Sequence, residues 1–137
     1  MAVEPVSMGL GITEGLTTYG KLRGAKRAEG MRSTIDSGEV GSTMTALAME
    51  FVFGRVWARA GLDGKQRSLV TIGILIALRQ TDELKNHVHL GLSNGLSAHE
   101  FEEAIIQAAA YAGFPAAHVA SNVLIEVLEG LETDSPK

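Results

Sequence analysis

The chain has 137 residues, of which 45% are hydrophobic and 20% charged, and its formal net charge is -4. This length predicts one domain with one core, and this composition excludes an intrinsically disordered chain. The negative charge disfavours general binding to nucleic acid or to anionic membranes. Cysteine is absent, which excludes disulfides, thiolate nucleophiles and cysteine-ligated zinc. No signal-peptide core follows Met1 and no apolar run is long enough for a bilayer, so a cytoplasmic location is expected.

The N-terminal third shows little periodicity. Residues 1–12 are expected to form a flexible tail, because they combine glycines and a proline without an apolar period. Thr13 is a candidate N-cap for a helix that runs to about Ala28, and residues 30–41 are predicted to form a loop. This helix carries a basic cluster, interpreted either as a solvated face or as a contact with an anion or another subunit. The cluster comprises Lys21, Arg23, Lys26 and Arg27.

From Ser42 onwards apolar residues return at spacings of three and four, which predicts an amphipathic helix ended by Gly61. Its apolar positions are Met44, Leu47, Ala48, Phe51, Val52, Val56 and Trp57.

A capping box, Asp63 with Gln66, predicts the start of the next helix. Residues 68–78 are apolar nearly all round, so this helix is expected to be central and covered on several sides. Arg67 lies in its first turn, where a cation opposes the helix dipole. A partner carboxylate and a substrate anion are both consistent with an arginine there.

The following helix is predicted to begin with Thr81 as its cap and to end at Gly95. At about 100° per residue, His87 lies beside the apolar stripe, with Glu83 one turn below it. His89 is about 200° away from His87 and faces elsewhere. The stripe comprises Leu84, Val88, Gly91 and Leu92.

Two more helices are predicted in the C-terminal part. A capping box of Ser97 and Glu100, with Leu96 and Phe101 as a hydrophobic staple, begins the first, which stops at Gly113. Pro115 begins the last, and residues 132–137 are expected to fray. Its inward positions are Ala117, Ala120, Val123, Leu124, Val127 and Leu128. Since no stretch alternates at period two, the predicted fold is an all-α single domain of about six helices, residues 1–137.

The Glu83–His87 pair is the best candidate for chemistry. A carboxylate one turn away can orient an imidazole as a proton carrier, although the same spacing is typical of a surface ion pair. A metal site would need a third ligand, and no residue supplies one. Trp57 and Tyr111 suit either the core or a pocket wall. His99 and His118 are expected at the surface.

Three segments resemble a known family. FGRVWARAGL, RSLVTIGILIAL and DELKNHVHLGLSNGLSAHEFEEAIIQAAAYAGFPAA are similar to the carboxymuconolactone decarboxylase family, and within it to the γ-carboxymuconolactone decarboxylases, from about Phe51 to Ala120. The wider superfamily includes alkyl hydroperoxidase D-like proteins, which carry a CxxC motif and a histidine four residues later. Aligning that histidine with His87 puts Gln80 and Glu83 at the thiol positions and Ser68 at an upstream glutamate. Thiol-dependent peroxide chemistry is thereby excluded.

The resemblance implies a helical protomer of the alkyl hydroperoxidase D-like type that assembles into homo-oligomers, commonly hexamers, with pockets shared between subunits. It also implies cofactor-free decarboxylation of 4-carboxymuconolactone to 3-oxoadipate enol-lactone in protocatechuate degradation. In that reaction His87 would deliver a proton or contact the carbonyl, Glu83 would orient His87, and Arg67 would bind the anion. Trp57 and Tyr111 would be pocket walls.

Several positions depart from the family pattern. His89 stands where the family has arginine, Phe53 where it has tryptophan, and Ala60 where it has proline. His89 is a weaker partner for a second substrate carboxylate than arginine. The alternatives are a family member acting on another lactone or oxo-acid, or a non-catalytic helical oligomer that binds a small acid.

Overall fold

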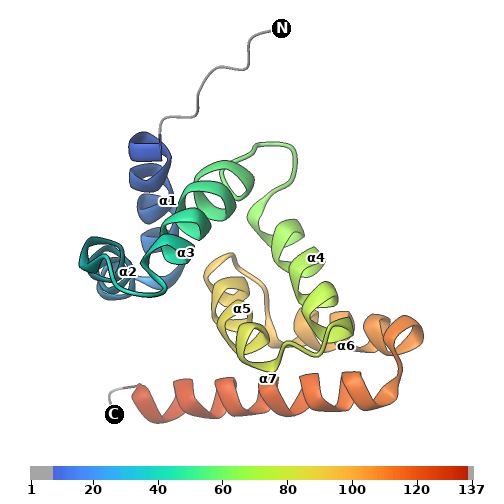
Figure 1. Ribbon diagram of the computed structural model, residues 1–137. Coiled ribbons are helices and arrows are strands. Elements are labelled where there is room, and N and C mark those ends of the chain that lie inside the picture. Colours follow the sequence, from blue (N-terminus) through green and yellow to red (C-terminus); the bar gives the residue numbers. More distant parts are fainter. Residues whose placement is uncertain (1–7, 136–137) are drawn as a thin grey trace, which may run out of the picture. The chain divides into compact units, whose positions relative to one another are not determined.

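The computed structural model describes residues 8–135, and within them every regular element is helical. There are seven α-helices and one π-helix across these residues (Figure 1), which confirms the all-α class. The chain divides into two compact units, Met1–Gly61 and Leu62–Lys137. That the two make one domain stays a prediction. None of the described helices is both long and apolar enough to cross a membrane.

The first unit contains α1 (Met8–Arg23), α2 (Ala25–Ser37), α3 (Ser42–Leu47) and the π-helix η1 (Ala48–Val56). In Figure 1, η1 continues α3 along the green part of the chain. The predicted start at Ser42 is confirmed. The predicted end at Gly61 is wrong, because the helix ends at Val56, with Trp57 as its C-cap.

The predictions for the N-terminal third are largely wrong. Thr13 lies inside α1 instead of capping it. Residues 8–12 of the expected tail belong to the same helix, and its residues 1–7 lie outside the described residues. The helix breaks at Gly24, whose φ of 93° suits glycine. The predicted loop is mostly α2, which buries no residue. A helix without a buried face has no apolar stripe for periodicity to detect.

Glycines let α1 and η1 approach backbone to backbone. A Cβ on Gly15 would lie 1.7 Å from the carbonyl oxygen of Met49, and one on Gly54 would lie 2.6 Å from that of Gly11. Such distances are far below van der Waals contact, so only glycine fits at either position. Close approach at these points selects the buried side of η1.

That buried side differs from the predicted one. Met44 is 71% exposed and Phe51 60% exposed, although both belong to the predicted stripe. The prediction failed because apolar residues occupy nearly every position there, and because a π-helix does not keep the α-helical period. The residues buried instead are Ser42, Ala46, Met49, Glu50, Phe53 and Gly54.

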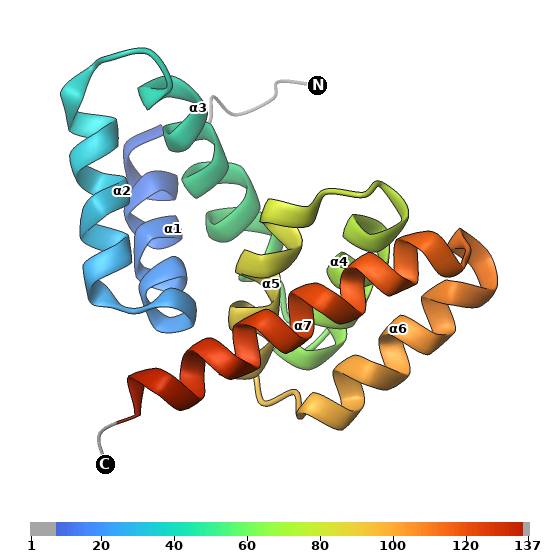
Figure 2. The same cartoon turned by 90° about the horizontal axis from the view of Figure 1, so that it is seen from below.

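The second unit contains α4 (Gly64–Ala77), α5 (Thr81–Ser93), α6 (Ala98–Ala112) and α7 (Phe114–Asp134). Figure 2 shows α7 (red) lying across α5 and beside α6. Both predicted capping boxes are confirmed, at Asp63 and at Ser97. For α5 the N-cap is Gln80, without a side-chain hydrogen bond, so the prediction of Thr81 is wrong by one residue. Residues 132–134 belong to α7 and not to a frayed tail.

The core of this unit follows the predicted stripes of α5 and α7. Gly91 matters most, since a Cβ there would lie 2.5 Å from the Phe101 ring. Because Gly91 has no Cβ, α5 can pack directly over Phe101, which is 1% exposed. The core comprises Ile72, Ile76, Leu84, Val88, Leu96, Phe101, Ile105, Ala116, Ala117, Ala120, Val123, Leu124 and Val127.

The expectation that α4 is covered on several sides is wrong for the isolated chain. Ile72 and Ile76 are buried, but Val70, Ile74 and Leu78 are 55%, 52% and 63% exposed. One face of α4 packs on the core, and the opposite face is apolar and open.

Candidate functional site

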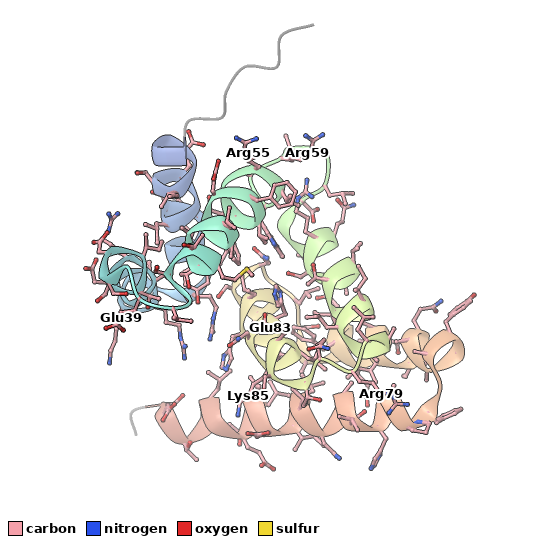
Figure 3. All side chains as sticks on the ribbon, viewed as in Figure 1. Glu39, Arg55, Arg59, Arg79, Glu83 and Lys85 are labelled. Atoms are coloured by element: carbon pink, nitrogen blue, oxygen red, sulfur yellow. The ribbon has the colours of Figure 1, made fainter. Side chains whose placement is uncertain are left out.

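The Glu83–His87 pair lies on α5 as predicted. Asp82 and Glu83 occupy the first turn, where carboxylates complement the helix dipole. His87 follows one turn later, and its Nε2 is 3.9 Å from Glu83 Oε2. Figure 3 shows Glu83 on α5. This distance is longer than a direct hydrogen bond, so the contact is one between charges when the imidazole is protonated.

The two members of this pair differ in their exposure to water. The Glu83 side chain is 60% exposed, whereas that of His87 is only 11% exposed. The Nδ1 atom of His87 is shielded from solvent. A shielded imidazole with a carboxylate at its outer edge can hold or transfer a proton where little water competes. His89 is half-buried and two residues further along, so it lies on another side of α5.

Arg67 lies in the first turn of α4 and is half-buried, with its Nε shielded from solvent. Its neighbour Ser68 is completely buried and accepts a hydrogen bond from Asn94 Nδ2 at 3.0 Å. This bond places the start of α4 beside the end of α5. Asn94 is seven residues beyond His87, which is about 10 Å along a helix axis. The long side chain of Arg67 would have to span that distance to share a small ligand with His87.

Asn94 is a structural residue that the sequence reasoning did not identify. A Cβ on Gly64 would lie 2.6 Å from Asn94 Oδ1, so the carboxamide fits because Gly64 leaves room for it. The hydroxyl of Ser68, the residue that the resemblance aligns with an upstream glutamate, accepts the hydrogen bond from Asn94. An asparagine at a helix end is common for local reasons, so nothing in the sequence indicated the link to Ser68.

Tyr111 is 86% exposed at the end of a groove between α4 and α6. The interpretation of Tyr111 as a core aromatic is therefore wrong for the isolated chain. The groove encloses about 780 Å³, and Gly73, Ala77, Ala104 and Ala108 give it a floor of small residues. A second groove of about 770 Å³ lies between α6 and α7 and includes the exposed His118. His99 is also exposed.

A smaller cavity of about 210 Å³ lies where α4 meets α5 and α7, beside Arg79. Neither His87 nor Arg67 lines this cavity or either of the two grooves. The second unit thus brings Glu83 and His87 together but keeps Tyr111 apart from them. Among the described residues, no group of three or more histidine, aspartate or glutamate side chains is arranged to hold a metal ion.

The remaining predicted residue, Trp57, lies in the first unit. Its ring stacks on Phe53, with centroids 6.3 Å apart and planes at 17°. Phe53 in turn meets Tyr19 edge-on at 5.0 Å, so three aromatic rings form a row. The same unit buries Glu50, a carboxylate that the sequence analysis did not single out. An acid inside an apolar stretch of helix was the signal that could have identified it.

Comparison with known proteins places these features in a family context. Residues 43–126 match the carboxymuconolactone decarboxylase family, a match that includes η1 and α5. The chain is 42% identical over 81 residues to the 4-carboxymuconolactone decarboxylase of Acinetobacter baylyi, covering 59% of this chain and 60% of that protein. It is 44% identical over 69 residues to the nitrosuccinic acid decarboxylase of Metarhizium robertsii, covering 50% of this chain and 48% of that protein.

A third relative is an uncharacterised 15.0 kDa protein of Paracoccus denitrificans, 36% identical over 76 residues, covering 54% of this chain and 57% of that protein. The chain thus spans between about half and three fifths of the length of each of these relatives.

Proposed function

The chain belongs to the carboxymuconolactone decarboxylase family, and on that premise we propose that it is a carboxy-lyase acting on 4-carboxymuconolactone. The observation that carries this proposal is the Glu83–His87 pair, which lies within the matched region and holds a nearly buried imidazole beside a carboxylate. The two named relatives are both decarboxylases of small acids, which supports the reaction class.

The proposed substrate contains its own electron acceptor. Its leaving carboxylate is on the ring carbon that is conjugated through a C=C bond to the lactone carbonyl. When the bond to CO2 breaks, the electron pair moves into this system and forms a dienolate. A proton added at the α-carbon then gives the enol-lactone. The protein needs to bind the remaining carboxylate, stabilise charge on the carbonyl oxygen and deliver one proton.

Three residues of the second unit suit these tasks. His87 delivers the proton or contacts the carbonyl oxygen, since its side chain is shielded from water and lies beside the Glu83 carboxylate. Arg67 contacts the substrate carboxylate from the start of α4, and its side chain must be fully extended to do so. Glu83 orients His87 and stabilises its protonated form. His89 contributes to substrate binding from α5. The roles of Tyr111 and Trp57 as pocket walls stay predictions, since Tyr111 lines a groove that does not include His87 and Trp57 belongs to the first unit.

A second candidate is a different small acid with an electron acceptor of the same kind. The match to a nitrosuccinic acid decarboxylase favours this option. In nitrosuccinic acid one carboxylate is on the carbon that bears the nitro group, so a nitronate can receive the electron pair. Neither substrate requires an external electron sink. The histidine at position 89, instead of the family's arginine, makes a substrate other than the lactone dicarboxylate a real competitor.

We also propose that the chain self-associates through the open apolar face of α4. This face is defined by Val70, Ile74 and Leu78, which are 52% to 63% exposed. It borders the groove between α4 and α6, where small residues allow a second helix to approach closely. A contiguous apolar surface of this kind is typical of a protein–protein interface.

The test is to incubate the purified protein with 4-carboxymuconolactone and, separately, with nitrosuccinic acid, and to follow CO2 release and product. Release from the lactone supports the first proposal, and release from nitrosuccinic acid alone supports the second. Binding of either acid without CO2 release would mean a non-catalytic binding protein and would overturn both. His118→Asn, at an exposed histidine, is the control for substitutions at His87.

A further inference from the structure

The first unit buries a carboxylate that the proposed reaction does not use. Glu50 is 5% exposed, and its Oε1 lies 3.5 Å from Nη2 of Arg55, whose side chain is 46% exposed. A buried carboxylate is costly unless a cation or hydrogen-bond donors compensate it. Arg55 provides that compensation from the solvent side, and Figure 3 shows it at the end of η1.

This ion pair depends on the unusual helix geometry. Glu50 and Arg55 are five residues apart, which in an α-helix is about 140° beyond a full turn, so the side chains would diverge. A π-helix bonds residue i to residue i+5, which brings these positions one above the other. The same spacing of five residues recurs in a backbone hydrogen bond, which Trp57 N donates to Val52 O at 2.8 Å. The ion pair and the wide turns of η1 therefore stabilise each other.

The packing of α1 fixes Glu50 from the other side. A Cβ on Gly11 would lie 2.6 Å from Glu50 Cγ, so the glutamate side chain passes directly against the backbone of α1. Gly54, four residues later, packs against the carbonyl of the same Gly11. Glu50 is thus held between α1 and Arg55.

The orientation of Trp57 follows from η1. Trp57 is the residue directly after the π-helix, and its ring stacks on Phe53. Converting one wide turn to an α-helical turn shifts the hydrogen-bond register by one residue, which rotates everything beyond it by about 100°. A change at Glu50 would therefore reach Trp57 through the backbone.

We propose that Glu50, acting through Arg55, is a positioning residue that maintains the π-helical turns of η1 and thereby orients Trp57. The effect on Trp57 is independent of what the protein binds. Its consequence for substrate binding rests on the proposed function and on the prediction that Trp57 is a pocket wall.

Trp57 is the single tryptophan of the chain, so its fluorescence reports this orientation without any substrate. Glu50→Gln and Arg55→Gln each remove one charge of the pair, and the double variant removes both. The expected result is a red-shifted emission and stronger acrylamide quenching in each single variant, with no further change in the double variant. Glu29→Gln is the matched control, because Glu29 pairs with Arg32 on an exposed surface of the same unit. It should leave the emission unchanged.

With an acid that the protein turns over, both variants should raise KM by about three- to tenfold, as expected when an aromatic wall contact is displaced, and largely keep kcat. Wild-type emission in both single variants would overturn the proposal. If Glu50→Gln does not fold, Arg55→Gln decides, because Arg55 is partly exposed. If the unpaired Glu50 carboxylate prevents that variant from folding as well, the double variant decides, because it leaves no buried charge unpaired. Shifted emission with an unchanged KM would refute the role of Trp57 in binding. Shifted emission without turnover of either acid would refute the proposed function alone.

Discussion

Glu83 Oε2 lies 3.9 Å from His87 Nε2 across one turn of α5, and the glutamate is the exposed member of the pair. The carboxylate can therefore favour the protonated imidazole while it stays exposed to solvent itself. Because exposed charge pairs are worth little, most of the function of this pair should reside in His87.

The first prediction separates the two roles. His87→Asn should lower kcat by about 10²- to 10⁴-fold, the usual loss when a general acid is removed. Glu83→Gln should lower kcat by only about two- to fivefold, as expected for a partly screened charge. Asp82→Asn, an exposed acid in the same first turn, controls for the helix dipole and should keep full activity. Wild-type turnover by His87→Asn would show that another group delivers the proton.

The second prediction concerns two helical glycines of the same unit. Gly91→Ala should destabilise the fold by about 1–3 kcal/mol, because the new methyl group overlaps the buried Phe101 ring. Gly130→Ala should instead stabilise it by up to about 1 kcal/mol, since a Cβ at Gly130 in α7 meets nothing within 4 Å. Urea denaturation measures the free energy of unfolding of both variants. Equal changes in the two would contradict the packing of α5 on α6.

The sequence predicted the second unit well because its signals are local. Two capping boxes and the glycine stop at Gly113 depend on residues three or fewer positions apart, and the structure has each of them. The apolar stripes of α5 and α7 were also readable, since polar residues alternate with them on the opposite face. The pairing of Glu83 with His87 followed from helical spacing alone.

The first unit was predicted poorly for physical reasons. The face of η1 is selected by contacts of Gly15 and Gly54 with residues more than 30 positions away, and no local pattern encodes such contacts. The π-helical turns also break the period on which the prediction relied. The burial of Glu50 follows from both effects. Similarly, the link between Ser68 and Asn94 joins two helices and has no signature in either one.

The third prediction concerns pH. Lys65 Nζ lies 2.9 Å from Glu100 Oε1, and this hydrogen bond, together with that from the Ser97 backbone, holds the pKa of Glu100 below its usual 4.5. A lowered pKa in the folded state stabilises the fold above the unfolded-state pKa, and the gain is lost as pH falls through the folded-state pKa. Lys65→Met and Glu100→Gln should therefore lower Tm slightly at pH 7.

At pH values well below 4.5 both variants should melt together with the wild type, because its Glu100 is then protonated. Glu100→Gln keeps a side chain that can complete the capping box, so it isolates the charge. Adding salt should reduce the difference in Tm between the wild type and the variants at pH 7, since the Lys65–Glu100 pair is exposed. Thermal melts at both pH values test this prediction. A difference in Tm that persists in acid would show that packing and not charge causes the loss of stability.

The fourth prediction tests the open face of α4. Ile74 on α4 and Ile125 on α7 are each 52% exposed, so a glutamate at either position should be equally tolerated by the isolated chain. Ile74 lies among Val70 and Leu78 on the face proposed to bind a second copy, whereas Ile125 lies on another helix. Ile74→Glu should therefore reduce the mass measured by light scattering, because burying an unpaired charge in an interface is strongly unfavourable. Ile125→Glu should leave the mass unchanged. A monomeric wild-type protein, or equal dissociation of both variants, would show that this face is not where copies meet.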